Sequence, residues 1–284
     1  MTERTTPGAT DGDEWDIPLG GLAGLSRVQL ERTHLEAAVA EVRFLSVRSE
    51  LPEDEAVSIW KQLGQDTFPV FETHVQNILN VTVGPRGATQ STDAQRGWVL
   101  ANADRTSLIT LLPSTVVVQT NSYSRYSTSL GDPLRKVLAL FTEVTGASVV
   151  QRLGLRFINK VADPAAKSPL FWRDHIRKDF VGPLSGELGG LVSNLHQQVQ
   201  LQLDATATAR IQSGVFLEQG APQRYSFLID LDVFRDRSLT YDDTVCANLV
   251  RQLNRTALAL FAHVLSEKYL ADLGPVDLDR RKTQ

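Results

Sequence analysis

Residues 149–161, near the middle of the chain, constrain the fold more than any other stretch. Their sequence is VVQRLGLRFINKV, in which the apolar residues Leu153, Leu155 and Phe157 alternate with arginines and a glycine. A period of two residues is typical of a β-strand that buries one face. The stretch therefore predicts a strand with one apolar face and one face that carries arginines.

An earlier stretch, residues 38–44, has a related sequence, AVAEVRF. When its Arg43 and Phe44 are aligned with Arg156 and Phe157, the second half of the chain reads as a divergent copy of the first. A second pair of matching strings supports the same alignment, because LALF occurs at residues 138–141 and again at 258–261. We therefore interpret the chain as an internal duplication.

The first copy is predicted to begin with a strand at residues 37–47. Pro52 and the three acidic residues after it favour the start of a helix, because proline suits the first turn and acids complement its dipole. A long helix from residue 132 or 133 to Thr145 ends this copy, closed by Gly146. Residues 88–95 are polar and predict a mobile loop. Short strands are expected at residues 77–83, 97–103, 107–112 and 115–122, separated by turn residues.

The second copy is predicted to follow the same order. Ser168 and Pro169 have the sequence of a helix start, and the helix they open is expected to carry Phe171, Trp172, Ile176 and Phe180. The final helix is expected to run from residues 241–243 to about residue 270. Three strands are expected between these helices, at residues 193–203, 206–217 and 225–234.

These elements predict an α+β fold of two tandem divergent β-α-β(3-4)-α repeats, with an antiparallel sheet and helices packed on one face. Whether the two repeats share one continuous sheet, related by a pseudo-twofold axis, stays open at this point. The predicted divisions are a disordered or loosely attached acidic arm at 1–30, in which Trp15, Ile17 and Leu19 could contact the body, and a flexible tail at 273–284. The first repeat spans 31–147 and the second spans 148–272.

Composition excludes several classes of function. The net charge is −4 and the pI about 5.8, with no block of lysines and arginines, which argues against nucleic-acid binding. The only cysteine, Cys246, excludes an intramolecular disulfide and a multi-cysteine zinc site. The first residues lack the order of a secretory signal, and no apolar run approaches the roughly 20 residues that span a bilayer. We therefore expect a cytoplasmic protein without a membrane segment.

Two strings carry a resemblance to a known family. LEAAVAEVRF at residues 35–44 resembles the amino-terminal motif of a sporadically distributed bacterial family of uncharacterised proteins, and RLGLRFINK at residues 152–160 is similar to its central motif. The resemblance covers about residues 35–270. After the fourth β segment the family shows a Tyr followed by a Trp, whereas this chain has Tyr123 and Tyr126 with no Trp nearby. The resemblance implies a fold and an accessory, antitoxin, immunity or defence-type setting, but no established activity.

The candidate binding residues begin with arginines on the polar face of the predicted strands. Arg43, Arg152 and Arg156, with Glu41 nearby, could grip a carboxylate or a phosphate. The alternative is cross-strand pairing of these arginines with acidic residues on a solvent-exposed face. Asn159 points to the opposite face of the strand from these arginines, and it is expected to form hydrogen bonds with backbone groups where the strand ends.

Asp230 and Asp232 point to the same side of one predicted strand. Two such carboxylates could bind Mg²⁺, but a cation site needs more oxygen ligands, and pairing with the arginines is the simpler interpretation. The five histidines have no metal-ligand spacing, and no phosphate-binding glycine loop or nucleophile elbow occurs. The sequence thus assigns no catalytic residue, no cofactor and no metal site.

Two functions follow from these observations. The first is a non-catalytic module that binds a protein partner, which leaves homo-oligomer formation open. The alternative is an enzyme or small-ligand binder that holds an anionic or metal-bound ligand in a cleft between the repeats. The six residues that either function would use are Arg43, Arg152, Arg156, Asn159, Asp230 and Asp232.

Overall fold

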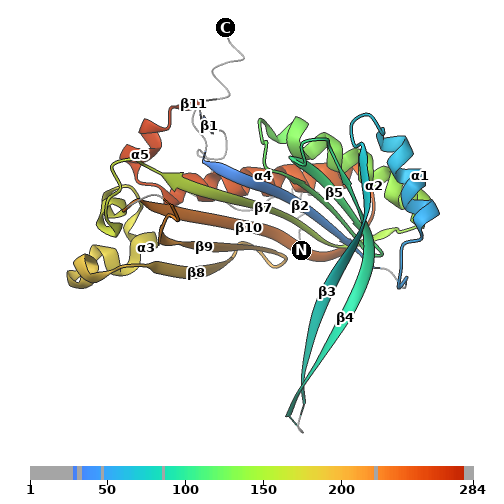
Figure 1. Cartoon of the computed structure of the whole chain (residues 1–284), viewed down its shortest axis with the longest axis horizontal. Coiled ribbons are helices and arrows are strands. Elements are labelled where there is room, and N and C mark those ends of the chain that lie inside the picture. The colour runs from blue at the N-terminus through green and yellow to red at the C-terminus, as the bar shows by residue number, and fades with distance from the viewer. Residues whose placement is uncertain (1–27, 31–33, 46–47, 85–86, 221–222, 278–284) are drawn as a thin grey trace, which may run out of the picture.

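One open sheet of nine antiparallel strands organises the structure (Figure 1). The computed structural model describes residues 28–30, 34–45, 48–84, 87–220 and 223–277. The strands lie in the order β3-β4-β5-β6-β2-β7-β10-β9-β8. The predicted α+β class with an antiparallel sheet is confirmed.

The strands of the sheet and the helices follow one another along the chain. The strands are β2 (Leu35–Phe44), β3 (Val70–Gly84), β4 (Gly87–Ala101), β5 (Ser107–Leu112), β6 (Thr115–Thr120), β7 (Val149–Ala162), β8 (Leu195–Gln202), β9 (Ala207–Leu217) and β10 (Tyr225–Thr240). The helices are α1 (Glu53–Leu63), α2 (Asp132–Thr145), α3 (Lys178–Val181), α4 (Asp243–Val264) and α5 (Glu267–Asp272). A separate ladder joins β1 (Val28–Leu30) to β11 (Pro275–Asp277).

The two strands that the sequence singled out lie side by side in the middle of the sheet. β2 pairs with β7, so that Ala40 lies opposite Leu155 and Val42 lies opposite Leu153. On its other side β7 pairs with β10, where Phe157 lies opposite Leu231. The sheet is therefore continuous from β3 to β8 through this central pair.

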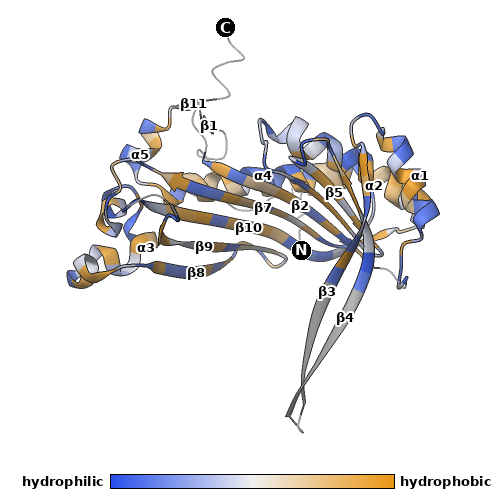
Figure 2. Ribbon diagram, viewed as in Figure 1, coloured by the Kyte–Doolittle hydropathy of each residue, from blue (hydrophilic) through white to orange (hydrophobic). Residues whose placement is uncertain are grey.

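Helices cover one face of the sheet, which we call the covered face. α4 contacts β7 and β10, and α2 contacts β6, while α1 packs on α2 (Figure 1). The alternate residues of β7, Leu153, Leu155 and Phe157, are buried beneath these helices. Figure 2 shows the resulting alternation of hydrophobic and hydrophilic residues along the central strands. The opposite face, on which Arg152 and Arg156 lie, is called the open face.

Two predicted helices are wrong in extent. The single final helix is interrupted at Leu265, which has an extended backbone and bridges Ile176, and Ser266 then caps α5 by accepting a hydrogen bond from Tyr269 N–H. The helix predicted after Ser168 is instead a 3-10 turn, Pro169–Asp174, followed by the short α3. In both places the helical spacing of apolar residues continues past the point where the helix ends. The helix ends there because the segments around Ile176 and Leu265 contact each other, which the spacing does not show.

The β3–β4 hairpin is longer than the sequence predicted. Residues 88–95, expected to be a loop, belong to β4 and pair with β3 in an unbroken register from Val70–Ala101 to Gly84–Gly87. The outer part of the hairpin extends well beyond the other strands (Figure 1).

Some predictions concern residues that the structure does not describe. Trp15, Ile17 and Leu19, and most of the arm predicted at 1–30, lie outside the described residues, as does the end of the tail predicted at 273–284. None of the helices in the described part of the chain combines the length and apolar character that crossing a bilayer requires.

Candidate functional site on the open face of the sheet

Strand register gathers charged side chains from distant segments onto the open face. Across the central pair, Arg43 lies opposite Arg152. Across the next pair, Asp232 lies opposite Arg156 and Asp236 lies opposite Arg152. Because antiparallel partners project to the same side of a sheet, three strands contribute to one charged cluster.

Arg152 is the centre of this cluster. Its Nε lies 3.3 Å from Glu41 Oε1, its Nη1 donates to Asp236 at 3.1 Å, and its Nη2 donates to Asp232 at 3.5 Å. The guanidinium carbon also lies 3.7 Å from the ring centroid of Phe234, as in a cation–π contact. Only 16% of the Arg152 side chain is exposed. Each of its three guanidinium nitrogens already contacts a carboxylate of the protein.

Gly154 lies beside the guanidinium group of Arg152. It lies on the open face between the two arginines of β7 and pairs with Phe234 of β10. A Cβ atom at this position would lie 3.5 Å from the Phe234 Cβ and 3.7 Å from Arg152 Nη2. A larger side chain would therefore occupy the space in which the guanidinium stacks on the ring.

Arg156 forms a second, two-pronged pair. Its Nε donates to Asp230 Oδ1 at 2.8 Å and its Nη2 donates to Oδ2 at 2.6 Å, which is the fork geometry of a strong charge-assisted contact. The hydrogen bond with Asp230 raises the pKa of Arg156 above its ordinary value. Asp230 is buried, with 7% of its side chain exposed, whereas 48% of Arg156 is exposed. One edge of this guanidinium thus faces outward.

Asp232 lies between the two arginines of β7. Burial raises its pKa above the ordinary value, although Arg152, Arg210 and Arg156 act in the opposite direction. Arg210 of β9 approaches to 3.8 Å, which extends the charged cluster to a fourth strand. The carboxylate therefore carries a desolvation penalty that its arginine neighbours only partly offset.

The sequence-predicted residues divide into two groups. Arg43, Arg152, Arg156, Asp230 and Asp232 all lie on the open face, with Arg43 54% exposed at the rim and paired with Glu41 at 2.8 Å. Asn159 lies on the covered face, where it is buried and donates to the carbonyls of Phe157 and Ile229. The charged cluster has the cross-strand pairing that the sequence offered as the alternative to anion binding.

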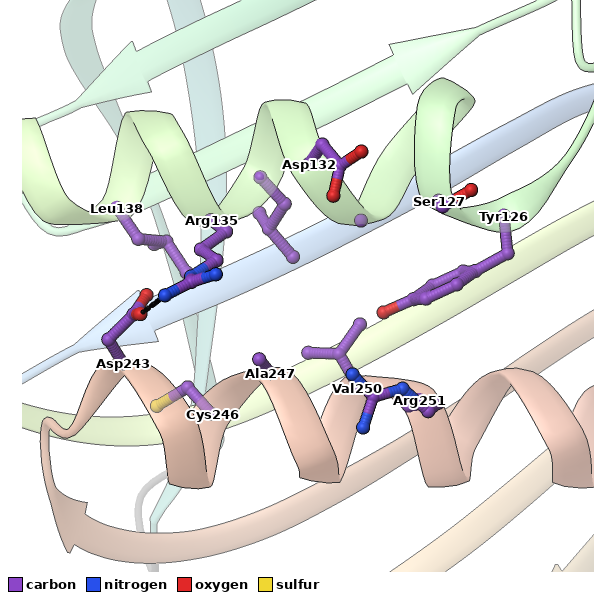
Figure 3. A pocket seen from close by; sticks show the side chains of 12 residues that line it. Tyr126, Ser127, Asp132, Arg135, Leu138, Asp243, Cys246, Ala247, Val250 and Arg251 are labelled. Carbon is purple, nitrogen blue, oxygen red and sulfur yellow. Dashed lines mark hydrogen bonds and ion pairs between the residues drawn. The ribbon is translucent and has the colours of Figure 1, made fainter.

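A cavity of about 170 Å³ lies elsewhere, between the first half of α2 and the first half of α4 (Figure 3). Arg135 and Asp243 form an ion pair of 2.6 Å across it, and the Tyr126 side chain projects toward α4 near Arg251. None of the six sequence-predicted residues lines it. Its lining is Tyr126, Ser127, Gly131, Asp132, Leu134, Arg135, Leu138, Asp243, Cys246, Ala247, Val250 and Arg251.

The phenol and the thiol that line this cavity are not activated. Burial raises the pKa of Tyr126 to about 12, with Arg251 opposing the shift, and burial raises the pKa of Cys246 to about 11. A thiol and a phenol with such values stay protonated at neutral pH, so neither is a nucleophile there. Sequence reasoning missed the cavity because its walls come from two helices more than a hundred residues apart. The π-helical segment Ser127–Gly131, which contributes to the lining, is a property of the folded backbone that no sequence pattern indicated.

The described part of the chain contains no group of three or more His, Cys, Asp and Glu side chains arranged as metal ligands. Asp230 and Asp232, the pair considered for a cation, instead face arginines.

Comparisons with known proteins assign no family. No family model matches the chain, and no curated protein matches it. One solved structure, the RNA triphosphatase Pct1 of S. pombe, can be aligned with this protein at 9% sequence identity and a TM-score of 0.11. The alignment covers 88% of this chain and 84% of the Pct1 chain. A TM-score this low supports no inference about fold or activity.

Proposed function

We propose that this protein is a non-catalytic module that binds a protein partner, and that the partner docks on the open face and on the β3–β4 hairpin. The observation that carries the proposal is the length of that hairpin. The charged cluster on the open face supports it, because its arginines are paired within the protein and its exposed groups form a mixed-charge surface.

The outer hairpin stands apart from the rest of the sheet. β4 pairs with β5 only through Trp98–Ala101, so the eleven residue pairs from His74–Gly97 to Gly84–Gly87 pair only with each other. We call this segment, residues 74–97, the hairpin arm. An isolated two-stranded hairpin is at best marginally stable in water. Residues 75–84 also contain no charged residue, although charges are a common means of protecting an unpaired strand edge. A partner that covers the arm supplies both the missing stability and the missing protection.

The state of the arginines argues for a partner surface over an anion site. A bound phosphate or carboxylate would have to displace Glu41, Asp232 and Asp236 from Arg152, whose nitrogens they share. A protein surface needs no such exchange, because it can pair with the outward edge of Arg156 and with Arg43 at the rim.

We also propose that the two halves of the chain are divergent copies of one β-α-β(3-4)-α unit. The sheet order supports this, since β2 and β7 are adjacent and each is followed outward by the last strand of its own half, β6 or β10. The hairpin arm has no counterpart in the second half, where β8 has eight residues. If the halves are copies, the arm is an addition to one of them, as expected of a feature with a specific partner.

The experiment replaces residues 75–96 with Asn-Gly, which forms a two-residue hairpin turn between His74 and Gly97. Full-length protein and this variant are expressed at native level in the host and their stoichiometric partners captured. The captured partner is then purified and its affinity measured by calorimetry. We expect the variant to keep its thermal unfolding midpoint and to lose the partner.

A matched control, Arg105→Ala, removes an exposed ion pair with Glu72 at the base of the hairpin and leaves the arm intact. It should bind the partner as the unaltered protein does. Absence of any stoichiometric partner, or equal affinity of the arm-shortened variant, would falsify the proposal.

The cavity between α2 and α4 favours a second candidate function, the binding of a small ligand. Its walls combine apolar side chains with Arg251, Asp132, the Tyr126 hydroxyl and the Arg135–Asp243 ion pair, a mixture of both charges that suits a small polar ligand with an apolar part. A thermal-shift screen of nucleotides, organic acids and divalent metals tests it. Stabilisation that Arg251→Ala abolishes and Arg156→Ala retains would support the cavity, and the reverse pattern would assign the ligand to the open face.

A further inference from the structure

β8 forms an end of the sheet and is unusually open for an edge strand. It pairs with β9 in a register without interruption from Leu195–Val215 to Gln202–Thr208, so no bulge twists its outer edge away. Its sequence, LHQQVQLQ, contains no proline, lysine, arginine, aspartate or glutamate. Natural edge strands commonly carry at least one of these protections, because an unpaired edge recruits other strands.

The two faces of β8 are well differentiated. His196, Gln198, Gln200 and Gln202 are exposed, whereas Leu195, Gln197, Val199 and Leu201 are partly buried. Gln197 fixes the strand to the body by donating hydrogen bonds to the Phe180 carbonyl and to Ser213 Oγ. The strand is thus held firmly on its inner side, and in the described residues its outer side has no neighbouring strand.

We propose that β8 pairs antiparallel with β8 of a second copy of this chain, which joins the two nine-stranded sheets into one. The charge pattern selects a second copy as the occupant. In a twofold antiparallel pair each residue lies near its own equivalent or that residue's neighbour, so a charged edge would place like charges together. β8 carries no Lys, Arg, Asp or Glu, so two copies can pair in any register without bringing such like charges together. Its glutamine side chains can both donate and accept hydrogen bonds, so they can pair with one another.

Exposed leucines next to β8 add to the same surface. Leu188 and Leu191, in the 3-10 turn Glu187–Leu191 that precedes the strand, are two of the large apolar side chains that the described residues expose. In an antiparallel pair the start of one β8 lies beside the end of the other. The two leucines of each copy then lie near the end of the neighbour's β8, where they lose contact with water.

The other edge of the sheet is formed by β3. Its base carries Glu72, and its uncharged residues 75–84 belong to the hairpin arm, which the proposed function assigns to a different protein. The inference about β8 is therefore independent of the proposed function and can fail separately from it.

The test uses the full chain, whose monomer mass is 31.3 kDa, in sedimentation equilibrium at several protein concentrations. The variant carries Gln198→Lys and Gln200→Lys, which place four lysines around the twofold axis while changing only exposed side chains. We expect the unaltered protein to be a dimer and the variant to dissociate at least about tenfold more readily.

The charge-matched control carries Gln119→Lys and Gln151→Lys, at exposed positions of the interior strands β6 and β7. It should remain a dimer, as should the arm-shortened variant described above. Thermal unfolding verifies that each variant is folded. A monomeric unaltered protein, an edge variant that dimerises normally, or a dimer lost on shortening the arm would each overturn the inference.

Discussion

The two faces of β7 show how one strand serves two purposes. On the covered face Leu153 and Leu155 are buried, and α4 packs on this strand. On the open face Arg152 is nearly as hidden, but carboxylates and an aromatic ring surround it. Burial on the first face arises from packing and on the second from charge pairing, so the faces should respond differently to substitution and to pH.

One cation breaks this division. Arg235 of β10 lies on the covered face, is 3% exposed and pairs with Asp204 at 2.9 Å. Asp204 lies in the turn between β8 and β9, where its carboxylate also accepts hydrogen bonds from the backbone N–H groups of Thr206 and Ala207. This pair holds that turn against the end of β10, and it allows charge on the covered face to be compared with charge on the open face.

The largest effect is expected for Leu155→Ala. The side chain is fully buried, and its loss leaves a cavity beneath α4, which should lower the free energy of unfolding by about 3–5 kcal/mol at any pH between 5 and 9. Urea denaturation measures the change. A loss below about 1 kcal/mol would mean that the covered face repacks and is not the main source of stability.

Asp204→Ala should follow, with a loss of about 2–3 kcal/mol, because it leaves Arg235 buried without its carboxylate. Although burial acts to raise it, the pKa of Asp204 is held below its ordinary value of 3.8 by Thr206, Ala207 and Arg235. The contribution of this carboxylate is therefore complete above that value and is lost as pH falls through the lower folded pKa. Denaturation between pH 2 and 7 should show a smaller acid-induced loss in the variant than in the unaltered protein. An equal slope in both would contradict the role of this pair.

Arg152→Met should lower the free energy of unfolding by about 1–2 kcal/mol at pH 7, since three carboxylates then face one another. The pKa of Asp232 is already raised by burial and should rise further without this arginine. A raised carboxyl pKa lowers stability above the folded pKa, and the loss diminishes as pH falls toward the unfolded value. The destabilisation should thus shrink between pH 7 and 4, whereas the destabilisation by Asp204→Ala should shrink only as pH falls below 3.8. Lys in place of Met should restore part of the stability.

The smallest effect is expected for Arg43→Ala. The side chain is half exposed and its pair with Glu41 is at the rim, so the free energy of unfolding should change by no more than about 0.5 kcal/mol. Its affinity for the captured partner should nevertheless fall. If Arg43→Ala lowers the free energy of unfolding as much as Arg152→Met does, Arg43 stabilises the fold as strongly as the arginine at the centre of the cluster.

Sequence reasoning predicted those features that depend on local pattern. The alternation around Leu155 identified the central strand, and the apolar spacing before Gly146 identified α2 with its end at Thr145. Residues 88–95 were missed because periodicity detects a strand through the face that it buries, and this segment offers no apolar alternation. The break at Leu265 was missed because a contact with Ile176 determines it.

The candidate site shows the same limit. Parity alone placed Arg152, Arg156, Asp230 and Asp232 on polar faces. Arg156 forms its fork with Asp230 and not with Asp232. This choice depends on the diagonal geometry between β7 and β10, since Arg156 and Asp230 are 74 residues apart in the sequence. Likewise, the three carboxylates reach Arg152 because of how β2 and β10 are aligned with β7, and the sequence of one strand does not show this alignment.

The central pairing of β2 with β7 also has a consequence for how the chain folds. Glu41 and Arg152, which meet across it, are separated by 111 residues, whereas β5 and β6 or β8 and β9 are joined by short turns. Short loops close first, so the outer hairpins should form early and the central pair late. Until then the facing edges of β2 and β7 are unpaired. The chain is therefore most prone to aggregate before β2 and β7 pair. A chaperone, or rapid synthesis of the second half, would shorten this period.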